Sequence, residues 1–259
     1  MSEQTGSGAT SHDEQGPRGR SAGRKAVGVL TELVVVVVGA LLISAMLRAF
    51  VGQMFIIPSG SMQNTLQVND RVVVSKIGSF HRGDVVVFED SAGWILERPQ
   101  ERSELGKLGE TIGVLPSTAS NHLIKRVIGM PGDTVSCCDD HGRLLVNGVP
   151  IDETSYLYSD ADGQVAASDF DFQVTVPAGR IFVLGDHRNA SGDSRCHLSD
   201  VDPMTAFVAE DRVVGRAVAV AAPLDRLQTL RNPDVFTEVP APVGAAPTRP
   251  SVSPKDATC

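Results

Sequence analysis

Hydrophobic and polar positions divide the chain into four parts. Residues 1–25 are rich in Gly, Ser, Glu and Arg and hold few large apolar side chains. Such a stretch cannot bury enough apolar surface to offset its ordering entropy, so we expect a disordered tail. Residues 26–48 form a long apolar run, and residues 49–222 alternate short β-branched runs with turn residues. Residues 223–259 turn polar and proline-rich, which also predicts disorder.

The apolar run has the length of a membrane-spanning helix. From Ala26 to Leu47 it reads AVGVLTELVVVVVGALLISAML, and Glu32 is the one charge inside it. At about 1.5 Å per residue, a helix of this length matches a hydrocarbon core roughly 30 Å thick. We therefore predict a single transmembrane helix over residues 26–48.

The basic residues around this run set its expected orientation. Only Arg48 follows the run before Arg71, whereas four basic residues precede it: Arg18, Arg20, Arg24 and Lys25. The positive-inside rule therefore predicts a cytoplasmic N-terminus and an extracytoplasmic remainder, in a protein that crosses the cell membrane once. A cleaved secretory signal and a buried core helix are the alternatives. We favour the uncleaved anchor because the run is long for a signal and ends without a small-residue cleavage pattern.

Residues 49–222 are predicted to fold as a mainly β, antiparallel β-sheet domain. Many short β-branched segments are bounded by turn residues, and few show helical periodicity. Asn147-Gly148, between two valines, is a strong signal for a two-residue hairpin. The predicted strands are Arg71–Ile77, Asp84–Phe88, Leu123–Ile128, Thr134–Ser136, Arg143–Val146, Phe172–Val176, Ile181–Leu184 and Val213–Val220.

Two stretches interrupt the strand pattern. Residues 90–121 are largely polar, and we predict an exposed insertion with a short helix between Pro99 and Val114. Residues 152–170 read DETSYLYSDADGQVAASDF, which predicts an acidic surface loop.

Composition narrows the classes of partner and site. A net charge of −8 argues against nucleic acid as a main partner, because phosphate neutralisation needs clustered Lys and Arg. The four cysteines have no zinc-ligand spacing, so no metal site is predicted. A bridge between neighbours Cys137 and Cys138 would close a strained ring and is disfavoured. A bridge from one of them to Cys196, or free thiols throughout, are the alternatives; the pairing of Cys259 stays open.

Lys125 is the first candidate for chemistry. In a strand over 123–128 it would share a face with Leu123 and Val127, so its ammonium group would be desolvated. Desolvation lowers the pKa of a lysine, as a general base working near neutral pH requires. An edge-strand lysine that extends to water is the commoner arrangement and remains the alternative.

Two serines stand where the chain leaves the apolar run. Pro58-Ser59-Gly60-Ser61-Met62 predicts a sharp turn with exposed hydroxyl groups. A nucleophilic serine needs a nearby base and donors for the oxyanion. A third segment, GDHRNASGDSR over residues 185–195, predicts a tightly hydrogen-bonded loop in which Asp193 and Arg195 are spaced to pair.

The order of these segments resembles bacterial type I signal peptidase, a Ser–Lys serine endopeptidase also called leader peptidase. Five blocks match: the apolar span, PSGSM with Asn64-Thr65-Leu66, RGDVVVF over residues 82–88, IKRVIGMPGD over 124–133, and residues 185–195. The resemblance implies that Ser61 is the nucleophile and Lys125 the general base. It implies an oxyanion hole formed by the Ser61 N–H and the Ser59 hydroxyl. It also implies supporting roles for Ser191, which would orient the lysine, for the ion pair of Asp193 with Arg195, and for Gly185.

The same resemblance implies an activity. The enzyme would remove signal peptides from exported preproteins, without a cofactor and in contact with membrane lipid. The resemblance leaves open whether the protein translocation machinery is also a partner. Family members prefer small side chains before the cut, which implies shallow apolar pockets near Phe55, Ile56 and the strand Arg71–Ile77. The sequence departs from the family pattern at His187, where Asn is frequent, at Asn189-Ala190, and at Cys196, where an aromatic residue is usual.

Three other interpretations compete with this one. A Ser-His-Asp enzyme could use His81 or His187 with Asp84, Asp186 or Asp193, although the chain has no G-x-S-x-G motif. An anchored β domain that only binds partners would share the span and the strands. An autoproteolytic Ser–Lys repressor would lack the span. The choice of preproteins, the oligomeric state and the role of the C-terminal tail are beyond what the sequence indicates.

Overall fold

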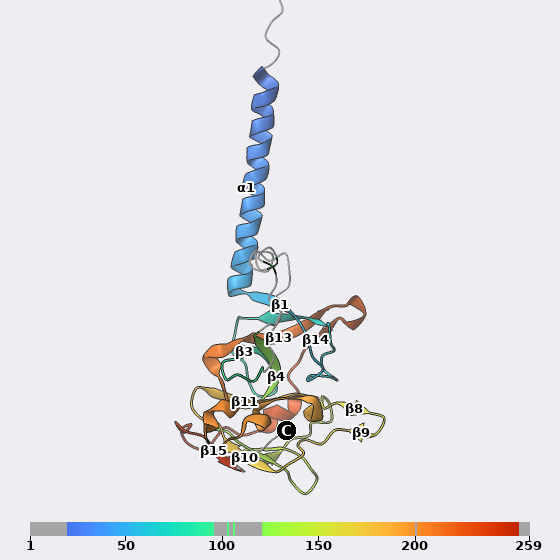
Figure 1. The fold of residues 1–259 in the computed structure, drawn as a ribbon, viewed down its shortest axis with the longest axis vertical. Helices are drawn as coiled ribbons and strands as arrows, with labels where there is room; N and C mark the ends of the chain where they lie inside the picture. The colour runs from blue at the N-terminus through green and yellow to red at the C-terminus, as the bar shows by residue number, and fades with distance from the viewer. Residues whose placement is uncertain (1–19, 96–102, 104–105, 107–120, 200, 254–259) are drawn as a thin grey trace, which may run out of the picture. The chain divides into compact units, whose positions relative to one another are not determined.

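The chain is a mainly β protein with one long N-terminal helix (Figure 1). The computed structural model describes residues 20–95, 103, 106, 121–199 and 201–253. It divides into two compact units, Met1–Ile43 and Ser44–Cys259, which we describe separately. Of the predicted disordered tail 1–25, residues 1–19 lie outside the described residues, whereas residues 20–25 are helical rather than disordered. Most of the predicted insertion 90–121 also lies outside the described residues.

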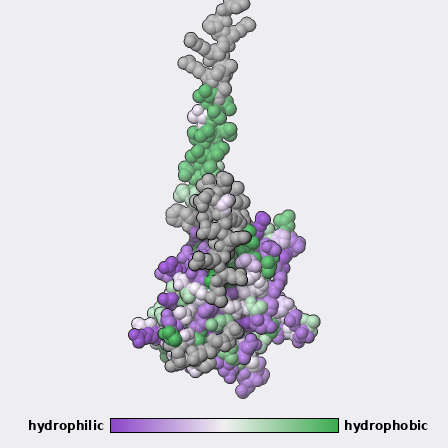
Figure 2. All heavy atoms as spheres, in the orientation of Figure 1, coloured by the Kyte–Doolittle hydropathy of each residue, from purple (hydrophilic) through white to green (hydrophobic). Residues whose placement is uncertain are grey.

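Helix α1 runs from Arg20 to Phe50, so it begins and ends beyond the predicted 26–48. Its stretch from Val27 to Met46 is apolar enough to cross a membrane, with a mean hydropathy of 2.5. Figure 2 shows this helix covered by hydrophobic side chains. None of the side chains from Val27 to Met46 is buried against other parts of the described chain. A helix that is apolar all round and unburied by protein fits the predicted membrane span.

All eight predicted strands are present, and their ends lie within two residues of the prediction. Within the described residues, the larger sheet has eight antiparallel strands in the order β1-β2-β13-β3-β4-β11-β12, with β14 paired to β13. Their bounds are β1 Gly52–Ile56, β2 Arg71–Ser75, β3 Val85–Glu89, β4 His122–Gly129, β11 Arg180–Leu184, β12 Val208–Ala209, β13 Val213–Ala222 and β14 Gln228–Thr229.

A second antiparallel sheet has the order β15-β10-β5-β6-β7 among the described residues. Its strands are β5 Thr134–Cys137, β6 Leu145–Val146, β7 Val149–Pro150, β10 Phe172–Thr175 and β15 Ser251–Ser253. The predicted hairpin is confirmed: Val146 pairs with Val149 across Asn147 and Gly148, which both have positive φ. Short 3-10 helices connect the strands: η1 Arg188–Ala190, η2 Ser194–His197, η3 Pro203–Ala206, η4 Glu210–Arg212, η5 Leu224–Arg226 and η6 Asp234–Glu238.

The C-terminal segment corrects one prediction. Residues 223–253 are ordered rather than disordered: β14 and β15 pair with the two sheets, and η6 packs on the core. Phe236 and Val239 are only 5% and 7% exposed. A few apolar side chains are enough to hold a proline-rich segment when an existing core receives them, which composition does not reveal.

The segment 152–170 is also more than a surface loop. It forms a small hairpin, β8 Ser159–Asp160 with β9 Gly163–Gln164, and its ends enter the core. Glu153, Tyr156, Leu157 and Ala167 are buried.

The cysteine prediction is wrong as well. Cys137 and Cys138 form a disulfide with each other, and neither is joined to Cys196. The peptide bond between them is cis, which brings their Cα atoms to 3.0 Å.

Candidate active site

Ser61 and Lys125 meet in a buried position. Ser61 lies in the turn after β1, where Met62 and Leu66 are fully buried and fix the turn to the core. Lys125 lies in β4, paired with Val86 of β3. Its Nζ donates a hydrogen bond of 2.6 Å to Ser61 Oγ. Lys125 is 3% exposed and Ser61 is 6% exposed, so water has little access to this contact.

The surroundings of Lys125 lower its pKa to about 8 from an ordinary 10.5. Burial is the main cause, because the charged ammonium loses hydration. The carboxylates of Asp193 and Asp186 raise the pKa again, and Arg195 lowers it. With a pKa of about 8, roughly one lysine in ten is neutral at pH 7, compared with fewer than one in a thousand at the ordinary value.

Gly185 lets the chain after β11 approach the turn that holds Ser61. A Cβ atom at this position would lie 2.2 Å from Ser191 Oγ and 2.5 Å from the Ser61 carbonyl oxygen. Any larger residue would therefore displace one of the two serines. Ser191 Oγ is buried without a hydrogen-bond partner among the described residues, so the implied contact with Lys125 is not made here.

Asp193 and Arg195 form the predicted ion pair. Arg195 Nε donates to Asp193 Oδ1 at 2.9 Å, and both side chains are at most 1% exposed. Burial raises the pKa of Asp193, but the charge and hydrogen bonds of Arg195 outweigh it, so the pKa is lowered. Asp193 Oδ2 also accepts from the Gly185 N–H at 3.0 Å, which fixes the glycine beside the turn that holds Ser61.

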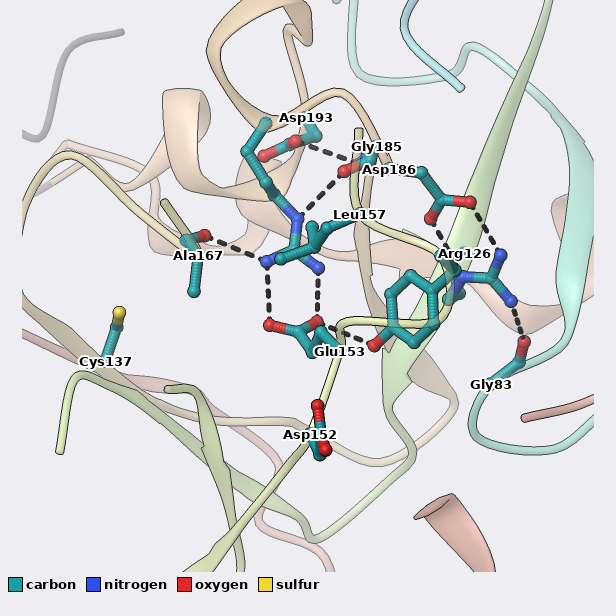
Figure 3. A network of polar contacts seen from close by, with 12 residues as sticks. Gly83, Arg126, Cys137, Asp152, Glu153, Leu157, Ala167, Gly185, Asp186 and Asp193 are labelled. Carbon is teal, nitrogen blue, oxygen red and sulfur yellow. Dashed lines mark hydrogen bonds and ion pairs between the residues drawn. The ribbon is translucent and has the colours of Figure 1, made fainter. Parts of the chain in front are cut away.

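A buried charge network next to this pair escaped the sequence prediction (Figure 3). Arg126, the neighbour of Lys125, donates to both carboxylate oxygens of Asp186 at 2.8 and 2.6 Å and to the Gly83 carbonyl at 2.7 Å. Asp186 also accepts from Thr65 Oγ1 at 2.5 Å. These bonds connect β4, the turn of Ser61 and the loop after β11.

The second half of the network comes from the segment 152–170. Glu153 pairs with Arg188, whose Nε donates to the Gly185 carbonyl at 2.9 Å (Figure 3). Tyr156 donates to Glu153 at 2.7 Å, and the Arg126 guanidinium lies 4.2 Å from the centre of the Tyr156 ring. The partners in this network are far apart along the chain, so the sequence does not indicate which of them pair. The one signal for the network in the sequence is the group of charged residues within 185–195.

A small cavity of about 30 Å³ is lined in part by Ser61 and Lys125. Ser59, which is exposed, lines it together with residues that are mostly apolar. Phe55 and Ile56 belong to the lining as predicted, but residues 71–77 do not. The full lining is Phe55, Ile56, Ile57, Pro58, Ser59, Ser61, Val87, His122, Leu123, Ile124 and Lys125.

The histidine alternatives find no support in this geometry. The His81 side chain is 70% exposed and lies 3.7 Å from Asp84. His187 stacks on Tyr158 and contacts Gly60 and Gln63. The side chain bonded to Ser61 Oγ is the lysine.

Known proteins share this sequence pattern. The family model described as signal peptidase, peptidase S26, matches residues 30–222. Signal peptidase I of Mycobacterium tuberculosis is 34% identical over 250 residues, which cover 86% of this chain and 81% of that protein. Signal peptidase I of Leptolyngbya laminosa is 35% identical over 195 residues, covering 73% of this chain and 78% of that protein. Signal peptidase I T of Bacillus subtilis is 31% identical over 201 residues, covering 74% and 85%. The chain therefore belongs to the signal peptidase, peptidase S26, family and is an enzyme of the signal peptidase I type.

Proposed function

We propose that this enzyme removes signal peptides from exported preproteins with Ser61 as nucleophile and Lys125 as general base. One observation carries the proposal: the 2.6 Å contact of Nζ with Oγ, buried at the edge of an apolar cavity. A binding domain would gain nothing from a desolvated lysine, whose burial costs stability.

The reaction would proceed in two steps. The neutral amine of Lys125 takes the proton of Ser61 Oγ as this oxygen attacks the scissile carbonyl carbon. The carbonyl π electrons move to oxygen, where the Ser61 N–H and the Ser59 hydroxyl stabilise the oxyanion. Collapse of this intermediate breaks the C–N bond, and Lys125 returns the proton to the leaving amine. Lys125 then takes a proton from water as the water oxygen attacks the acyl carbon; the C–Oγ bond breaks, Ser61 Oγ receives the proton, and the signal peptide leaves with a new carboxylate.

The cavity suits a substrate with small residues before the cut. Its volume of about 30 Å³ and its apolar lining leave room for a small side chain beside Ser61. A large side chain there would displace the buried walls, at a cost of roughly 1–3 kcal/mol. This agrees with the substrate preference that the family resemblance implies.

Helix α1 would hold the enzyme in the membrane, with the N-terminus cytoplasmic and the peptidase domain extracytoplasmic. The apolar stretch Val27–Met46 and the basic residues before it support this orientation. Anchoring confines enzyme and signal peptide to one surface and raises their effective concentration. Digestion of intact cells with an added protease tests this orientation. The peptidase domain should be cut once the protease reaches the outer face of the membrane, while the membrane itself is still intact.

Cleavage of a purified preprotein by the detergent-solubilised full-length protein tests the chemistry. We expect Ser61→Ala and Lys125→Ala to abolish cleavage, Ser59→Ala to reduce kcat about 10²-fold, and the exposed control Ser79→Ala to match the wild type. Equal cleavage by wild type and Ser61→Ala would favour the binding interpretation. Full cleavage by Lys125→Ala would point back to a histidine base.

A further inference from the structure

His187 contacts the nucleophile turn at three points. Its backbone N–H donates to the Ser61 carbonyl oxygen at 3.1 Å. Its ring atom Nδ1 lies 2.9 Å from Gln63 Oε1 and 3.3 Å from the Gly60 carbonyl oxygen. Both of these partners are acceptors, so Nδ1 carries the hydrogen and shares it between them, with the shorter contact to Gln63.

The Gly60 carbonyl belongs to the peptide group that contains the Ser61 N–H. This oxygen accepts from His187 Nδ1 and from the Gln63 N–H at 2.9 Å. In the part of the chain that the structure describes, cis peptide bonds occur only at Cys137-Cys138 and Ala222-Pro223, so this peptide is trans. In a planar trans peptide the C=O and N–H point in opposite directions. Hydrogen bonds that fix the carbonyl oxygen therefore also fix the direction of the Ser61 N–H.

The ring of His187 is itself held in place. It stacks on Tyr158, with ring centroids 3.8 Å apart and planes 24° from parallel. Tyr158 belongs to the segment 152–170, and its N–H donates to the Asp186 carbonyl at 3.0 Å. The donor is therefore positioned by a second segment of the fold rather than by its own loop alone.

We infer that His187 is a positioning residue, whose Nδ1–H orients the Gly60–Ser61 peptide so that the Ser61 N–H faces the oxyanion formed during cleavage. The inference rests on the proposed function, with Ser61 as the nucleophile. Nδ2 of an asparagine and Nδ1 of a histidine are both bonded to Cγ, so either residue can supply a donor at this point.

Three His187 variants of the full-length protein separate the donor from the ring, and a fourth variant, at Ser61, tests the nucleophile. His187→Asn keeps a donor on Cγ and loses the ring, whereas His187→Phe keeps a ring and loses the donor. His187→Gln keeps the amide but displaces it by one carbon. Ser61→Ala reports whether the nucleophile is assigned correctly, independently of His187.

The readout compares kcat with KM and the affinity for a peptide aldehyde with that for an uncleavable peptide. Ser61 Oγ adds to the carbonyl carbon of an aldehyde, its proton passes to Lys125, and the carbonyl oxygen becomes an oxyanion. The affinity for the aldehyde therefore depends on the oxyanion donors. We expect His187→Phe and His187→Gln to lower kcat and aldehyde affinity by about tenfold or more, with KM and uncleavable-peptide affinity within about twofold. His187→Asn should keep kcat within about threefold of wild type.

Two results would overturn this role. Wild-type kcat in His187→Phe would show that no donor is needed. Equal losses in His187→Asn and His187→Gln would show that the ring, not the donor, matters, and this amide pair decides the question even if the Phe variant does not fold. In either case an inactive Ser61→Ala variant would leave the proposed function intact. An active Ser61→Ala variant would remove the basis of both the proposed function and the role of His187.

Discussion

Replacing Lys125 with methionine should stabilise the protein while abolishing cleavage. Methionine has a similar length and no charge, so it can fill the same buried space. The lysine pKa falls from 10.5 to about 8 because its ammonium is buried. Lowering the pKa by about 2.5 corresponds to about 3 kcal/mol of unfavourable folding free energy, at about 1.36 kcal/mol for each pKa unit. Loss of the hydrogen bond to Ser61 offsets about 1 kcal/mol. We therefore expect a net gain of about 2 kcal/mol in the free energy of unfolding at pH 7.

The pH dependence of this gain identifies its origin. Between about pH 8 and 10.5, Lys125 is neutral in the folded protein and protonated in the unfolded chain. The unfolded state binds more protons there, so the stability of the wild type rises with pH. The methionine variant lacks this group. Its advantage should be largest below about pH 8 and should shrink as the pH rises towards 10.5.

Chemical denaturation of the detergent-solubilised full-length proteins measures the effect. Trp94 is the only tryptophan of the chain and stacks on His197, with ring centroids 4.4 Å apart, so its fluorescence reports unfolding of the β domain. Lys76→Met, at a partly exposed lysine, is the matched control and should change stability by less than about 0.5 kcal/mol. A Lys125→Met variant less stable than wild type, or a difference independent of pH, would refute the claim that Lys125 is buried at an electrostatic cost.

Three further predictions test the site and the fold. The value of kcat/KM should rise with pH and level off above about 8, because the base must be neutral; a rate that falls over this range would exclude Lys125 as the base. Gly185→Ala should lower kcat about 10²-fold, since its methyl group would displace the adjacent serines, whereas Gly192→Ala, with open space around it, should match the wild type in the same cleavage assay. Phe236→Ala should lower the free energy of unfolding by about 3–5 kcal/mol, because its side chain is buried. The exposed control Val243→Ala should have no effect. Equal denaturation curves for the two variants would mean that the C-terminal segment does not stabilise the domain.

The strands were predictable because their signals are local. A β-branched run bounded by turn residues identifies β3 or β4 without knowledge of its neighbours. Strand β1 was missed because its sequence, GQMFI, follows an apolar helix directly and resembles its continuation. The ordered segment 223–253 was missed because its order depends on a few side chains, such as Phe236, entering a core formed elsewhere.

The sequence by itself determined the order of motifs, and with it the candidates Ser61 and Lys125. It could not determine that the two side chains meet, because 64 residues separate them along the chain. It also gave no sign of the pairing of Arg126 with Asp186, or of the contact between His187 and Gly60. Only the tertiary structure decided these points. The pKa of an amine depends on the water excluded and the charges placed around it, and those come from segments that are distant in the sequence and adjacent only after folding.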